Sequence, residues 1–126
     1  MTEKARESTR AALRELYKAM STATRPKCGA CRVPLSCCAH EYCGLVAERA
    51  EEFGEPVPTE TGHPRLPYMG EHGCVVPPHL RPLCTMHVCS INSIGADPND
   101  PKFTKHYFEL RSQIEELEWA LADDTN

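Results

Sequence analysis

The sequence predicts a mainly α-helical, small, loop-rich domain that a metal stabilises, with amphipathic helices at both termini. Three observations predict this fold class. Apolar residues recur at helical spacing near each end of the chain. Eleven prolines and seven glycines interrupt it, mostly in the middle, and all eight cysteines lie between residues 28 and 89. Because large apolar side chains are scarce, such a chain needs a disulfide or a metal in addition to its core.

The 126 residues fit a single domain, 1–126, with three regions. Residues 1–25 predict an N-terminal helix, strongest from about Glu3 to Thr22, and Pro26 is expected to end it because proline disfavours helix in the residue before it. Its apolar positions are Ala5, Ala12, Leu13, Leu16, Tyr17 and Met20.

The cysteine-rich region, 27–95, is expected to bind metal and to consist of loops with short helical pieces. The clearest piece spans 40–53, with Cys43, Val46, Ala47, Ala50 and Phe53 on one side and Gly54 as its stop. Residues 54–73 predict a long irregular segment, which is uncommon unless it is functional or tied down.

A C-terminal helix is predicted over 101–123, with Asp100 as N-cap and Pro101 as first helical residue. Its apolar seam consists of Phe103, Tyr107, Leu110, Ile114, Leu117 and Leu121. The two terminal helices either pack on each other or on the cysteine region, or they bind a protein partner or form a homodimer. Residues 1–27 carry seven Lys/Arg and residues 109–126 carry six Asp/Glu, which favours an antiparallel pair.

The start of the chain has no signal-peptide pattern, and no stretch is apolar enough for a membrane span. We therefore expect a cytoplasmic protein, in which clustered thiols are more often metal ligands or redox groups than disulfides. The net charge of −4 does not favour nucleic-acid binding. Disulfides and a catalytic cysteine remain alternatives.

The candidate metal ligands are Cys28, Cys31, Cys37, Cys38, Cys43, Cys74, Cys84 and Cys89. Cys28-Gly-Ala-Cys31 has the spacing of a metal knuckle, in which a short turn directs both sulfurs at one ion. Neighbouring Cys37 and Cys38 point in different directions, so they serve different metal atoms or only one of them is a ligand. Eight thiols suffice for two four-cysteine sites, or for one site with spare thiols.

Several residues near the cysteines are weaker candidates. Lys27, Arg32 and Arg81 flank the ligands, where they offset thiolate charge or are simply solvated. His40 and His87 lie between cysteines and are either ligands or neighbours of the ligands. Thiolates suit both zinc and a [4Fe–4S] cluster, and the spacing leaves that choice open.

The middle of the chain resembles the YkgJ-like family of cysteine-cluster proteins, which are described as zinc- or iron-chelating domains. The resemblance covers residues 28–89 and rests on three pieces, which are the Cys28-x2-Cys31-x5-Cys37-Cys38-x4-Cys43 run, Gly73-Cys74, and Arg81-Pro82-Leu83-Cys84-x4-Cys89. It implies metal binding and says little about the biological role.

Three functions remain open. The first is a metal-stabilised binding or scaffold module, which the thin core and the terminal helices favour. The second is an iron–sulfur redox or sensor protein, which the surplus of cysteines favours. The third is a metal-dependent enzyme, for which His87 beside Cys84 and Cys89 is the only sign.

Overall fold

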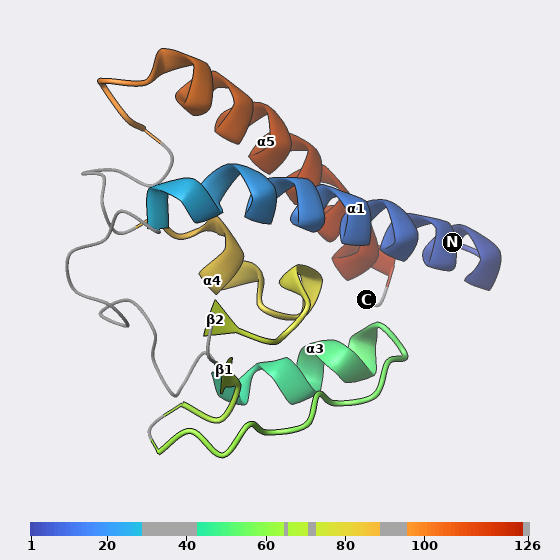
Figure 1. Cartoon of the computed structure of the whole chain (residues 1–126). Helices are drawn as coiled ribbons and strands as arrows, with labels where there is room; N and C mark the ends of the chain where they lie inside the picture. Colours follow the sequence, from blue (N-terminus) through green and yellow to red (C-terminus); the bar gives the residue numbers. More distant parts are fainter. Residues whose placement is uncertain (29–42, 65, 71–72, 89–95, 125–126) are drawn as a thin grey trace.

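The computed structural model describes residues 1–28, 43–64, 66–70, 73–88 and 96–124. It confirms a mainly helical chain with a long helix at each terminus (Figure 1). The elements in chain order are α1 (Glu3–Cys28), α3 (Val46–Glu52), β1 (Met69–Gly70), β2 (Gly73–Cys74), the 3₁₀ helix η1 (Pro78–Leu80), α4 (Pro82–Met86) and α5 (Pro101–Asp124).

Helices α1 and α5 run side by side in opposite directions, and the shorter elements pack beneath them (Figure 1). The two predicted apolar seams therefore meet each other. The buried members are Leu13, Tyr17, Met20, Phe103, Tyr107, Leu110 and Ile114, while Leu16, Leu117 and Leu121 are partly buried. The prediction was wrong for Ala5 and Ala12, which are exposed because they lie on the solvent side of α1.

Among the described residues, part of the positive charge of α1 is paired within that helix. Arg6 and Arg10 form ion pairs with Glu3 of their own helix, at 2.6 and 3.1 Å. Such exposed pairs stabilise a protein only slightly. Buried apolar surface is therefore the main force between α1 and α5.

The first helix continues past the predicted end, through Pro26 to Cys28. Proline costs the last turn one backbone hydrogen bond, but two side chains of that turn are anchored in the tertiary structure. The Thr24 hydroxyl donates to the carbonyl of Thr85 at 3.0 Å, and Lys27 binds two carboxylates near the start of α5. These contacts hold the turn in helical form.

The helix predicted over 40–53 corresponds to α3, and residues 40–42 lie outside the described residues. Val46, Ala50 and Phe53 are buried as predicted, whereas Ala47 is exposed on the solvent side of α3. Gly54 ends the helix as predicted. Its φ of 65° is the left-handed conformation that a helix C-terminus favours, and the N–H of Gly54 donates to Glu51 at 3.0 Å.

Asp100 is the N-cap of α5, as predicted. Its carboxylate Oδ1 accepts a hydrogen bond from the Phe103 N–H at 3.1 Å, and Pro101 is the first helical residue. The helix continues to Asp124, one residue past the predicted end.

The segment 54–73 is largely irregular, as predicted, and the described part is tied to the fold. The Thr61 hydroxyl donates to the Met69 carbonyl at 2.6 Å, and Leu66 and Tyr68 are buried. The segment ends in β1, which pairs antiparallel with β2 so that Met69 lies opposite Cys74.

Candidate metal centre

Two cysteines that are distant in the sequence, Cys43 and Cys74, lie close enough to interact electrostatically. Cys43 lies just before α3, and Cys74 is the second residue of β2. Both are partly buried against the hydrophobic core, and both are thiols rather than halves of a disulfide. The hairpin register determines this proximity, because it places Cys74 beside the chain that leads out of Tyr68.

The surroundings of Cys43 disfavour the negative form of its sulfur. Burial raises the pKa of the Cys43 thiol and the nearby Cys74 sulfur raises it further, while the Tyr68 backbone N–H, donating to the Cys43 sulfur, opposes both effects.

The described residues by themselves form no metal site. Among residues 1–28, 43–64, 66–70, 73–88 and 96–124, no three His, Cys, Asp or Glu side chains come close enough to hold one ion. The predicted ligands Cys31, Cys37, Cys38 and Cys89, and the weaker candidates Arg32 and His40, lie outside the described residues. Cys43 and Cys74 alone supply two thiols, fewer than a zinc or cluster site requires.

Cys84 and Arg81 lie apart from that pair, on α4 and at its N-terminus. The Arg81 side chain donates to the Val76 carbonyl at 2.8 Å and to the Thr85 hydroxyl at 3.1 Å. It thus joins the η1–α4 turn to the preceding chain. The prediction that Arg81 offsets thiolate charge stays a prediction.

Lys27 also has structural contacts that its position beside Cys28 did not indicate. Its ammonium lies 2.7 Å from Asp97 and 2.9 Å from Asp100, and 4.9 Å from the centre of the Phe103 ring. The two hydrogen bonds raise the pKa of Lys27. Lys27 therefore joins the end of α1 to the start of α5.

A buried polar network that no sequence pattern predicted joins α1, the chain after α3 and η1. His79 is 7% exposed, and its Nε2 lies 2.8 and 2.9 Å from the two carboxylate oxygens of Glu55. Arg14 of α1 donates to the same carboxylate at 2.9 Å. No spacing in the sequence marks these residues, because they come from three separate segments.

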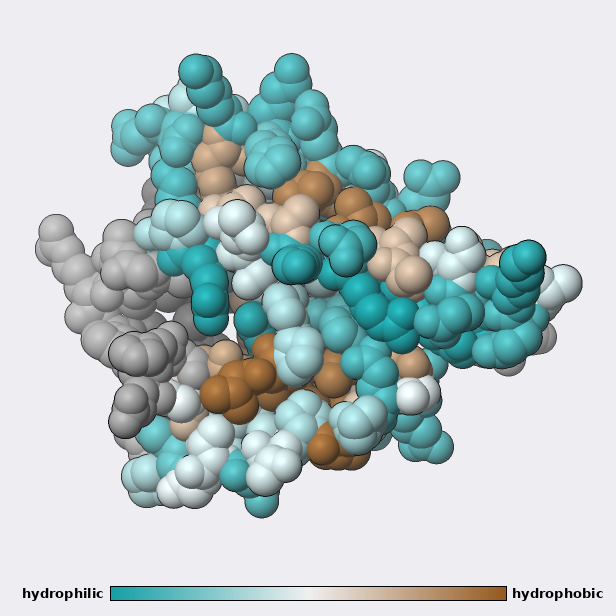
Figure 2. Space-filling model, turned by 45° about the vertical axis from the view of Figure 1, so that its right-hand side comes forward, coloured by the Kyte–Doolittle hydropathy of each residue, from teal (hydrophilic) through white to brown (hydrophobic). Residues whose placement is uncertain are grey.

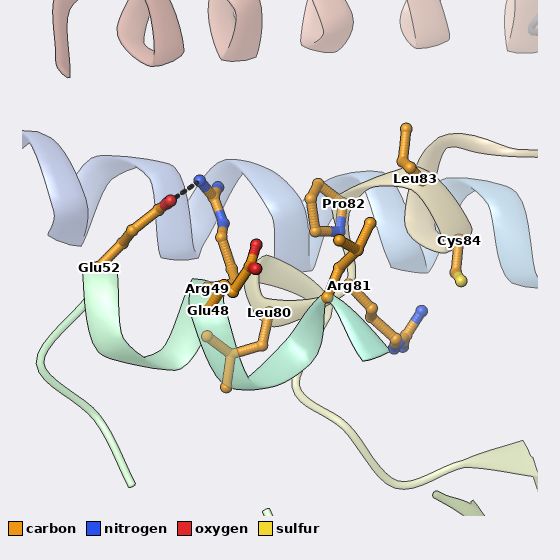
Figure 3. Close-up of a pocket in the computed structure, with 9 residues that line it drawn as sticks. Glu48, Arg49, Glu52, Leu80, Arg81, Pro82, Leu83 and Cys84 are labelled. Carbon is orange, nitrogen blue, oxygen red and sulfur yellow. Dashed lines mark hydrogen bonds and ion pairs between the residues drawn. The ribbon is translucent and has the colours of Figure 1, made fainter. Parts of the chain in front are cut away.

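A groove opens between α3 and the η1–α4 turn (Figure 3). Its volume is about 200 Å³. It is lined by Leu45, Glu48, Arg49, Glu52, Leu80, Arg81, Pro82, Leu83 and Cys84. On the face shown in Figure 2, a cluster of hydrophobic atoms lies at the level of α3 and η1, below α1 and α5.

The chain matches no protein-family model, and comparisons with curated proteins and with solved structures give no match either. The resemblance of residues 28–89 to the YkgJ-like family therefore stays a prediction. None of the described helices is both long and apolar enough to cross a membrane.

Proposed function

We propose that this chain is a small metal-binding protein whose cysteine region holds zinc or a [4Fe–4S] cluster, and that the metal stabilises a binding or scaffold module. The observation that supports the proposal most directly is that the Cys43 and Cys74 thiols lie close enough to interact electrostatically. They come from separate segments and form no disulfide. A reducing compartment such as the cytoplasm is part of the proposal, since thiols persist there.

The arrangement of the cysteines explains why a metal would stabilise this fold. Cys43 precedes α3, Cys74 belongs to β2, and Cys28 is the last residue of α1. A metal bound by cysteines from these segments would join elements that are far apart in the sequence. The affinity of such a site is then part of the folding free energy.

The nature of the metal decides between a scaffold and a redox or sensor protein. Zinc supplies a cross-link without redox chemistry, whereas a cluster supplies electron transfer. Cysteine sulfurs such as those of Cys43 and Cys74 suit zinc and an iron–sulfur cluster alike. A metal-dependent enzyme is the weaker candidate, because His87 between Cys84 and Cys89 is the only sign of it.

A partner at the terminal helices would have to use side chains other than the predicted seams, which are buried between α1 and α5. Phe108 and Trp119 of α5 remain 43% and 68% exposed. They are the apolar side chains through which α5 would meet a partner or a second copy.

Metal analysis tests the proposal. The protein is purified anaerobically without a metal-affinity step, and bound metals are quantified by mass spectrometry beside an absorption spectrum. Near-stoichiometric zinc without visible absorbance supports the scaffold, and iron with sulfide and broad visible absorbance supports redox or sensing. Removing the metal with a chelator should then unfold the protein. A folded chain that holds no metal and has its cysteines oxidised in pairs would refute the proposal.

A further inference from the structure

The groove between α3 and the η1–α4 turn has an apolar wall that is open to solvent. Leu45 and Leu83, at its edges, are 45% and 52% exposed. A volume of about 200 Å³ is below the range typical of small-molecule sites. A recess of this size suits one or two aliphatic side chains of a protein partner.

The exposed charge at the edge of the groove is negative. Glu48 and Glu52 lie one turn apart on α3 and both line it (Figure 3). The Glu52 side chain is 65% exposed, and one ion pair of 3.5 Å joins it to Arg49. Glu48 is exposed, and among the described residues it forms no ion pair.

The two arginines that line the groove both donate hydrogen bonds to other groups of the chain. Arg49 is 12% exposed, and it binds Glu118 of α5 and the carbonyl of His79. Arg81 donates to the Val76 carbonyl and to Thr85. A partner that approaches from solvent therefore meets leucines and two carboxylates.

We propose that this groove docks a basic amphipathic helix of a partner protein. A leucine-like side chain enters the recess between Leu45 and Leu83, and lysines or arginines one turn apart lie over Glu48 and Glu52. Helices bind grooves through apolar anchors at such spacing, and complementary charge sets their orientation. The proposal goes beyond metal binding and does not depend on which metal is bound.

Fluorescence anisotropy with two labelled synthetic helical peptides tests it on the full chain as purified. One peptide carries leucines at i and i+4 flanked by lysines, and the other carries the same leucines flanked by glutamates. We expect the lysine peptide to bind about tenfold more tightly. Replacing both Glu48→Lys and Glu52→Lys should reverse that preference, and the corresponding pair of glutamine substitutions should abolish it.

Apolar variants test the recess itself. Leu83→Ser should weaken binding of the lysine peptide about tenfold. Val57→Ser is the matched control, because Val57 is 51% exposed and lies outside the groove.

The proposal would be overturned if the two peptides bound equally or not at all. It would also be overturned if neither Leu83→Ser nor the charge reversal changed binding. Self-association that Leu83→Ser abolishes would overturn it too, since it assigns the groove to a second copy. Metal content measured on each sample separates these results from a failure of the metal proposal.

Discussion

The hydroxyl of Tyr17 on α1 donates a hydrogen bond to the carboxylate of Glu118 on α5 at 2.7 Å. The Tyr17 side chain is 1% exposed. Arg49 of α3 binds the same carboxylate, and its guanidinium lies 4.5 Å from the centre of the Phe53 ring. Three helices thus meet at one carboxylate. Burial and the neighbouring Glu118 charge raise the pKa of Tyr17 far above its usual range, so the phenol remains a donor.

Replacing Tyr17→Phe should destabilise the protein without changing its fold. The substitution removes one hydrogen bond to a charged acceptor and leaves the ring in place, so we expect a loss of about 1–2 kcal/mol in the free energy of unfolding. Urea denaturation followed by circular dichroism measures it. Trp119→Phe is the control, because Trp119 is 68% exposed and its loss should leave the urea midpoint unchanged. Equal midpoints for wild type and Tyr17→Phe would show that this bond contributes nothing.

The Glu55 carboxylate should make stability depend on pH. Burial raises the pKa of Glu55, but the hydrogen bonds from Arg14 and His79 outweigh it, and the pKa lies below its ordinary value of 4.5. A carboxyl with a lowered pKa in the folded state contributes stability above pH 4.5, and this contribution is lost as the pH falls through the lowered value.

Unfolding free energies measured from pH 6 downward, for wild type and Glu55→Gln, test this dependence. The difference between the two proteins should shrink below about pH 4.5, where the wild-type carboxylate gains a proton. Acid release of a metal affects both proteins alike and cancels in the difference. Glu115→Gln, on the exposed side of α5, should follow the wild-type curve. A constant difference across this range would contradict the assignment.

Gly54 and Gly44 form a matched pair for testing the end of α3. A Cβ at either position meets no atom within 4 Å, but only Gly54 has a positive φ, of 65°. Gly54→Ala should therefore cost about 1 kcal/mol through backbone strain alone. Gly44→Ala should be neutral or stabilise by up to about 1 kcal/mol, since alanine restricts the unfolded chain. Thermal unfolding compares them, and equal effects would mean that Gly54 does not end the helix in this conformation.

Replacing Cys74→Ser should lower the metal content of the purified protein. A hydroxyl is a much poorer ligand than a thiolate for zinc or an iron–sulfur cluster. Val75→Ser is the neighbouring control, because Val75 is 52% exposed and carries no ligand atom. Metal quantification on wild type and both variants decides the matter. Full metal content in Cys74→Ser would exclude Cys74 from the site, whatever the other cysteines do.

The helices at both ends of this chain could be predicted because their signals are local. Asp100 and Pro101 mark the start of α5, and Gly54 marks the end of α3. Spacings of three and four residues identified Tyr17, Tyr107 and Ile114 as core. Each of these signals depends on a few neighbouring residues, which the sequence shows directly.

Local signals failed where distant contacts outweighed them. Pro26 was expected to end α1, yet Thr24 and Lys27 hold the last turn through contacts with Thr85 and Asp97. The exposure of Ala5 and Ala12 likewise depends on where α5 and the shorter elements pack, which helical spacing does not define.

The sequence by itself determined the helical class, the caps of the helices and the set of candidate ligands, because these follow from residue type and short spacing. Only the tertiary structure decided that Cys43 lies close to Cys74, that Glu118 joins α1, α3 and α5, and that Glu48 and Glu52 border a groove. These relations depend on chain segments that are far apart in the sequence. Burial of their apolar faces sets which side chains become neighbours.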